Sequence, residues 1–136
     1  MAHTCNNFLM TCIDFRFHSA ITDWAEKQGI TKDFDLVAIA GVQKAILDDD
    51  TRNAAIKQLH ISVRLHKTRT AILIAHQDCG AYGGSSAFAN WDEEKAKYTE
   101  DLNEAEKVIK EKFPELQVKK MILTFDENEK VEIIEV

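Results

Sequence analysis

Hydrophobic positions along the chain fall into short apolar runs separated by longer segments with helical spacing. Three early runs, residues 8–12, 34–40 and 70–75, have the length and composition of buried strands. The third is apolar on both faces, which is typical of a strand inside a covered parallel sheet. Between the first two runs, Ile21, Trp24 and Ala25 share one face of a predicted helix, with Ser19 as its N-cap and Gly29 as its end.

Two further helices and a hairpin are predicted in the rest of the chain. Apolar residues at helical spacing indicate one helix from about residue 51 to 67 and a longer one from about 91 to 113, which Pro114 ends. Residues 118–125 and 130–136 are predicted strands, and the polar turn 126–129 joins them as a hairpin.

The order of these elements predicts an α/β fold in a single domain, residues 1–136. Strands that alternate with helices favour a central, mostly parallel β-sheet with helices on both faces. The final hairpin adds an antiparallel C-terminal edge strand. We expect the second strand to lie outside the first, so that right-handed connections place the first and third strands side by side.

Composition narrows the classes of function. Seventeen Lys and Arg against 23 Asp and Glu give a net charge of −6, which argues against nucleic acid or an anionic membrane surface as a partner. No apolar run approaches the roughly 20 residues that span a bilayer, and the first residues lack a signal-peptide pattern, so we expect a cytoplasmic protein. Three cysteines without a secretory signal favour metal binding or catalysis over disulfides.

Two of these cysteines accompany a histidine at the ends of predicted strands. Cys12 follows the first strand, and His76 and Cys79 follow the third. Carboxyl ends of neighbouring parallel strands meet at one edge of the sheet, where ligands bind in open α/β folds. Thiolate and imidazole are ligands that zinc prefers in tetrahedral sites, and three protein ligands leave one position for a catalytic water. The sequence therefore predicts one Zn²⁺ per chain.

A charged pair follows Cys12. Asp14 and Arg16 alternate with it and so share its side of an extended segment. The neighbouring arginine keeps the aspartate ionised and fixes its orientation. Such a carboxylate can accept a hydrogen bond from a metal-bound hydroxide or displace the water as a fourth metal ligand.

Together, Cys12-Ile13-Asp14-Phe15-Arg16 and His76-Gln77-Asp78-Cys79-Gly80 closely resemble the Cys-x-Asp-Ser-Arg and His-x-x-Cys-Gly motifs of the β-class carbonic anhydrases. The resemblance implies reversible hydration of carbon dioxide to bicarbonate and a proton through zinc-bound hydroxide, in a homodimer or larger homo-oligomer. Its motifs make Cys12, His76 and Cys79 the zinc ligands and Asp14 and Arg16 the catalytic pair. For a small apolar substrate we expect pocket walls from Phe15, Ile39 and Val42, with a substrate oxygen held at Gly80.

The sequence also departs from that family. Phe15 stands where the family has serine, and Ala38-Ile39-Ala40-Gly41 stands where Arg-Asn-Ala-Gly is frequent. Related members hydrolyse carbonyl sulfide or carbon disulfide, so such a hydrolase, or a non-catalytic zinc-binding relative, is the alternative.

Thiol catalysis with Cys12 as nucleophile is disfavoured, because phosphatase loops need a glycine-rich Cys-x5-Arg turn and position 18 is His18. The other cysteine and three further histidines are not accompanied by metal-ligating or charged residues in a comparable motif. They are predicted to fill the core or the surface: Cys5, His3, His60 and His66.

Overall fold

One five-stranded sheet organises the computed structural model, which describes residues 3–136. Its strands lie in the order β2-β1-β3-β4-β5. The first four are parallel, and β5 pairs with β4 in the antiparallel direction. Their bounds are β1 Asn7–Thr11, β2 Phe34–Ala38, β3 Thr70–His76, β4 Gln117–Phe125 and β5 Val131–Glu135. The predicted α/β fold is confirmed, as is the position of β2 outside β1.

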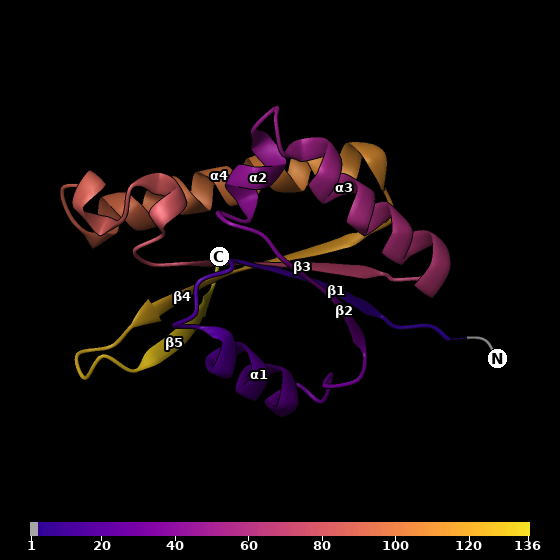
Figure 1. The fold of residues 1–136 in the computed structure, drawn as a ribbon, viewed down its shortest axis with the longest axis horizontal. Coiled ribbons are helices and arrows are strands. Elements are labelled where there is room, and N and C mark those ends of the chain that lie inside the picture. Colours follow the sequence, from indigo (N-terminus) through magenta and orange to yellow (C-terminus); the bar gives the residue numbers. More distant parts are fainter. Residues whose placement is uncertain (1–2) are drawn as a thin grey trace.

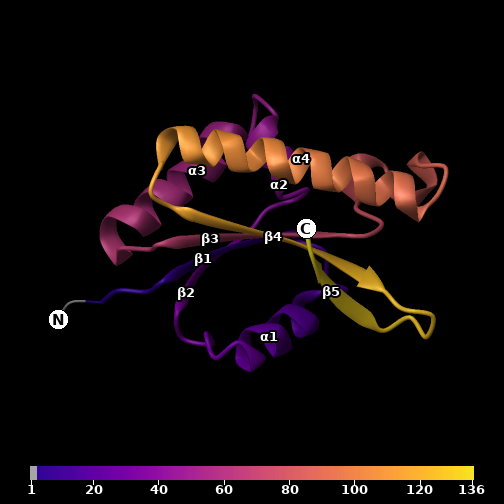
Figure 2. The same ribbon diagram turned by 180° about the vertical axis from the view of Figure 1, so that it is seen from behind.

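Helices cover both faces of this sheet. Helix α1 (His18–Lys27) lies on one face, and α2 (Gln43–Leu47), α3 (Arg52–Ile61) and α4 (Trp91–Lys112) lie on the other (Figures 1 and 2). Successive strand residues point to opposite faces, so Leu9 and Ile72 pack in the core under α1, whereas Met10 and Leu73 pack in the larger core under α2 to α4. Because both faces of the two central strands are buried, residues 8–10 of β1 and 71–75 of β3 are all apolar.

Helix α1 ends as predicted but begins differently. Gly29 has φ +71°, and the amides of Gly29 and Ile30 donate to the carbonyls of Glu26 and Ala25, which is the Schellman arrangement. Ser19 was expected to cap the helix, and that prediction is wrong. The residue before the helix is Phe17, which makes no side-chain cap and is instead buried in the core beneath α1. Packing of its ring fixes where the helix starts.

The segment from residue 43 to 67 is more broken than its hydrophobic pattern indicates. The short helix α2 has too few residues to show a period and was not predicted. The helix expected to continue to residue 67 changes at Ser62 into a π-helical turn, η1 (Ser62–His66). This turn ends at Lys67, whose φ of +61° is left-handed. The chain then enters β3.

The strand register brings the carboxyl ends of β1, β2 and β3 to one edge. Thr11, the last residue of β1, pairs with Ala38 of β2 and with Ile74 of β3. Cys12 therefore leaves the sheet at nearly the level where His76 ends β3. In residues 3–136 we find no helix with the length and apolarity that a bilayer span requires.

Candidate metal centre

Three metal-ligating side chains meet at this edge of the sheet. The sulfurs of Cys12 and Cys79 and a ring nitrogen of His76 all lie within 4.8 Å of one another. Cys79 and His76 are almost completely buried, and Cys12 is half-buried. Residues 64 positions apart in the sequence thus form one compact group with the donor types that zinc and similar cations prefer.

The orientation of His76 suits it for a metal. Its Nδ1 lies 2.7 Å from the carbonyl oxygen of Gln77, which can only accept, so a neutral, metal-binding ring keeps its proton on Nδ1. The lone pair then resides on Nε2, which is buried and has no hydrogen-bond partner among residues 3–136. A buried imidazole nitrogen without a partner is costly. A cation held between this nitrogen and the two sulfurs would satisfy it, so the donor set fits a metal.

The hydrogen bond between the two cysteine side chains also favours binding of a cation. A hydrogen bond from the Cys79 thiol lowers the pKa of Cys12 well below its usual range, against the effect of burial. The same contact, together with burial, raises the pKa of Cys79. One thiolate is therefore present at neutral pH even in the metal-free protein. Binding a divalent ion would displace the second proton and pair both charges.

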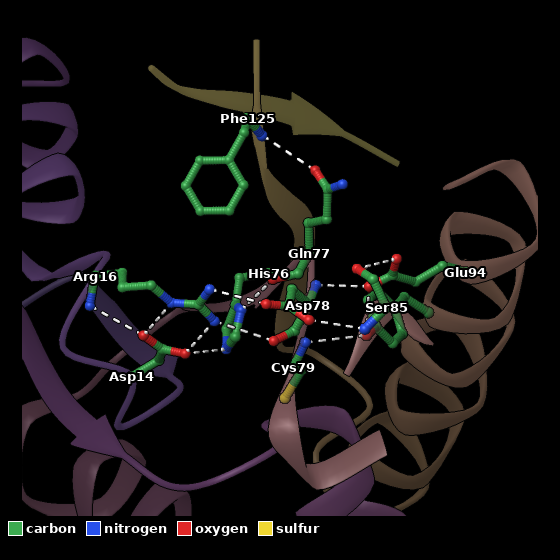
Figure 3. A network of polar contacts seen from close by, with 10 residues as sticks. Asp14, Arg16, His76, Gln77, Asp78, Cys79, Ser85, Glu94 and Phe125 are labelled. Atoms are coloured by element: carbon green, nitrogen blue, oxygen red, sulfur yellow. Dashed lines mark hydrogen bonds and ion pairs between the residues drawn. The ribbon is translucent and has the colours of Figure 1, made fainter. Parts of the chain in front are cut away.

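Beside these ligands, Arg16 joins two aspartates (Figure 3). Its Nε and Nη2 donate to the Asp14 carboxylate at 3.0 and 2.7 Å, and its Nη1 donates to the Asp78 carboxylate at 2.9 Å. A further bond of 3.1 Å joins Nη2 to the Asp78 carbonyl. The bidentate pair lowers the pKa of Asp14 to about 2. Asp14 Oδ2 lies 3.8 Å from Nε2 of His76, so an ionised carboxylate stands next to the metal position.

Aromatic side chains pack against His76 and Arg16. The ring of Phe17 packs on His76 with centroids 4.5 Å apart, and the guanidinium of Arg16 lies 5.4 Å from the same ring and 5.9 Å from that of Phe125. Gln77 connects β3 to β4 by accepting from the amide of Phe125 and the hydroxyl of Thr124. These contacts explain the burial of Phe17 at the start of α1.

Side chains of α4 hold the loop that carries Cys79 in place. The amide of Asp78 donates to the buried carboxylate of Glu94 at 2.6 Å, and Ser85 donates to its other oxygen at 2.8 Å. The hydroxyl of Tyr98 accepts from the Cys79 amide at 3.3 Å and donates to Glu94 at 2.9 Å. This network fixes a loop in which Asp78 has a left-handed φ of +60°.

The residues expected to contact substrate are spread around the centre. Val42 is buried directly before α2, with a φ of +48°, and Ile39 is half-buried in the same core. Gly80 opens a 3₁₀ turn and has open space around its Cα. Phe15 is 86% exposed, so in the single chain it forms no pocket wall. Their roles toward a substrate stay predictions.

Sequence reasoning missed several residues of this network. Asp78 precedes Cys79 and could have been noticed as a second acceptor, because an arginine has five donors and Asp14 uses only some of them. Glu94 and Tyr98 lie on a helix far along the chain, where their spacing indicates only a core-facing stripe. A cavity of about 790 Å³, lined in part by Arg69 and Pro114, opens at the opposite end of β3. Donor chemistry, and not cavity size, marks the candidate site.

Comparison with known proteins agrees with this geometry. A sequence model of the family described as "Putative carbonic anhydrase" matches residues 2–135. An uncharacterized protein of Rickettsia bellii (strain RML369-C) is 29% identical over 127 residues, which cover 89% of this chain and 77% of that protein. An uncharacterized protein of Rickettsia conorii (strain ATCC VR-613 / Malish 7) is 28% identical over 127 residues, which cover 89% and 68%. The names of these relatives assign no activity.

Proposed function

Because the chain belongs to the family described as "Putative carbonic anhydrase", we propose that it catalyses the zinc-dependent, reversible hydration of carbon dioxide to bicarbonate and a proton. The observation that carries the proposal is the Nε2 of His76, which has no hydrogen-bond partner within the described residues 3–136 and lies near two cysteine sulfurs and an aspartate that an arginine holds ionised. Sequence family, donor set and neighbouring carboxylate all support the same chemistry.

Cys12, His76 and Cys79 would hold one Zn²⁺ per chain. Two thiolates and a neutral imidazole balance the charge of a divalent ion, and three ligands leave a position open. When bound, zinc supplies the acidity that makes water a nucleophile at neutral pH. The Nδ1–H group of His76 donates a hydrogen bond to the Gln77 carbonyl. This bond fixes the orientation of the ring and strengthens Nε2 as a ligand.

Asp14 would orient the attacking water. With its pKa near 2, this carboxylate is no proton store at neutral pH and acts only as a hydrogen-bond acceptor. Accepting one hydrogen of the water directs a lone pair of its oxygen at the carbon of carbon dioxide. One carbon–oxygen bond forms, one proton leaves to solvent, and bicarbonate departs. Arg16 positions Asp14 by hydrogen bonding, and its positive charge lies between the carboxylates of Asp14 and Asp78.

Assembly is part of the proposal. The segment that carries Cys12 and Asp14 also exposes two large apolar side chains, Ile13 at 60% and Phe15 at 86%. Strand β2 lies at the edge of the sheet, where its outer backbone groups have no neighbouring strand, and Leu36 on it is 59% exposed. A second copy of the chain that covers this surface would complete the walls of the site. We expect a dimer in sedimentation analysis that Phe15→Ser weakens.

The test is stopped-flow hydration of carbon dioxide by protein loaded with one zinc per chain. We expect turnover that Asp14→Asn lowers by about 100-fold while metal content is kept. Asp23→Asn, on the exposed side of α1, is the matched control and should leave the rate unchanged. Zinc-loaded protein without hydration activity would refute the proposal. Parallel assays with carbonyl sulfide and carbon disulfide separate the hydrolase alternative, and inactivity on all three substrates leaves a non-catalytic zinc protein.

A further inference from the structure

A second group of mixed metal donors lies at the opposite edge of the sheet. Ligand atoms of Cys5, Asp35 and His66 also lie within 4.8 Å of one another. They come from the segment before β1, from the start of β2 and from the end of the π-helical turn η1. From this convergence we propose a second cation site, for a divalent transition metal of the zinc class.

The donor types fit such an ion. Sulfur, carboxylate oxygen and imidazole nitrogen together suit zinc and its neighbours and are a poor set for magnesium or calcium, which take oxygen. A thiolate and a carboxylate supply two negative charges, which balance a divalent cation. A fourth donor is within side-chain reach, since the ring centroids of His3 and His66 are 5.0 Å apart.

Partners behind the donors hold them in place. The hydroxyl of Ser62 donates to Asp35 Oδ2 at 2.7 Å and contacts the hydroxyl of Thr68 at 2.6 Å, and both residues are buried. Ligating carboxylates in proteins are commonly supported by such outer hydrogen bonds. By contrast, the hydrogen bonds of the Cys5 thiol within residues 3–136 are the weak ones typical of sulfur, 3.7 Å to Thr68 and 3.5 Å to the Asn7 carbonyl. A cation would give this sulfur a stronger partner.

The π-helical turn explains why these groups meet. Ser62 and His66 are four residues apart on η1, and both reach Asp35. Nδ1 of His66 lies 2.7 and 2.9 Å from the two Asp35 oxygens. π-Helical turns are rare and recur at functional sites. The backbone of the N-terminal segment joins the same turn, because the amide of Cys5 donates to the His66 carbonyl at 3.0 Å.

The two sites do not share a ligand and lie apart in space. Cys5 precedes β1 and Cys12 follows it, so an extended stretch of roughly 20 Å separates them. In Figures 1 and 2, the chain enters β1 at the same end of the molecule where the segment after α3 turns into β3. The side chains of Asp35 and His66 are 31% and 29% exposed, so an ion can enter from solvent. No sequence motif indicates this group, because its members are about 30 residues apart.

Cobalt binding to metal-free protein tests the proposal. In a Cys12→Ser/Cys79→Ser background, which lacks the thiolates of the first centre, we expect one Co²⁺ per chain and a thiolate-to-metal charge-transfer band. Adding Cys5→Ser should abolish the band, and Ser62→Ala should weaken binding by about 10–100-fold. Adding His66→Ala should abolish stoichiometric binding, whereas the matched control His60→Ala on exposed α3 should keep it.

Absence of Co²⁺ binding in this background, or binding that Cys5→Ser and His66→Ala leave unchanged, would overturn the second site and leave a hydrogen-bond network only. If the background variant does not fold, metal analysis of the otherwise unaltered chain decides. Two metals per chain, reduced to one by Cys5→Ser, support the site, and one metal that Cys5→Ser does not affect refutes it. Failure of the proposed function is distinguishable, since it would show as zinc-loaded protein without hydration activity, whether or not Cys5→Ser removes a metal.

Discussion

Removal of the Arg16 side chain should destabilise the folded chain even without metal. Arg16 donates two hydrogen bonds to the Asp14 carboxylate and two to Asp78. Hydrogen bonds to charged groups contribute about 1.5–3 kcal/mol each when shielded, but the arginine side chain is 32% exposed, and solvent reduces their worth. We expect Arg16→Ala to lower the free energy of unfolding by about 2–3 kcal/mol. Part of this cost arises because Asp14, only 16% exposed, keeps its charge without a partner.

The pKa of Asp14 gives an independent estimate. Its fall from 3.8 to about 2 corresponds to roughly 2 kcal/mol before screening. Because the folded-state pKa lies below the ordinary one, this stabilisation is complete above about pH 4 and disappears as the pH falls toward about 2. The difference between Arg16→Ala and the unaltered protein should therefore shrink over that interval.

Urea unfolding of metal-free protein, followed by circular dichroism, measures both effects. Arg64→Ala, at an exposed position on η1, is the matched control and should change the free energy of unfolding by less than about 0.5 kcal/mol. The reasoning fails if Arg16→Ala costs no more than the control. It also fails if the loss grows on acidification, because the sign of the Asp14 shift would then be wrong.

Three further predictions concern the walls and the ligands of the centre. Gly41→Ala should cost about 2 kcal/mol or more in urea unfolding, because φ is +82° and the new Cβ would lie 2.9 Å from that of Ala81; Gly29→Ala, equally left-handed but with open space, should cost about 1 kcal/mol. Tyr98→Phe should cost about 1–3 kcal/mol by the same measurement, since it removes the hydroxyl that bonds buried Glu94 and the Cys79 amide, and a loss below about 0.5 kcal/mol would contradict that role. Iodoacetamide at neutral pH should modify Cys12 of metal-free protein before Cys5, because burial raises the pKa of Cys5. Zinc should protect Cys12 from this reaction. Equal labelling of Cys12 in the metal-free and zinc-loaded proteins, measured by mass spectrometry, would count against the metal centre.

The fold and the grouping of Cys12 with His76 and Cys79 could be predicted because their signals are local. Buried strands with both faces covered leave apolar runs, and connection handedness places β1 beside β3, so Cys12 and His76 had to converge. Helix α2 is too short to show a period. The spare donors of Arg16 indicate that a second acceptor is possible, but only the folded loop after β3 brings Asp78, 62 residues later, to them.

The group of Cys5, Asp35 and His66 could not be predicted either, because its members lie far apart in the sequence. Cys5, Asp35 and His66 each look like an isolated polar residue in the sequence. Only the pairing of β1 with β2 and the change from α-helix to π-helical turn at Ser62 bring them together. A regular α-helix through residue 66 was predicted there, and such a helix would point its side chains in other directions.

The start of β1 also determines what happens at its end. Cys12 reaches His76 only in the observed register of β1 against β3, because a slip by one residue would turn its side chain to the other face. Contacts at the start of β1 support that register, because the amides of Arg69 and Thr70 both donate to the Asn6 carbonyl. The amide of Cys5 adds a bond to η1. A cation at Cys5 would therefore stabilise the register that places Cys12 beside His76, although roughly 20 Å of strand separates the two sulfurs.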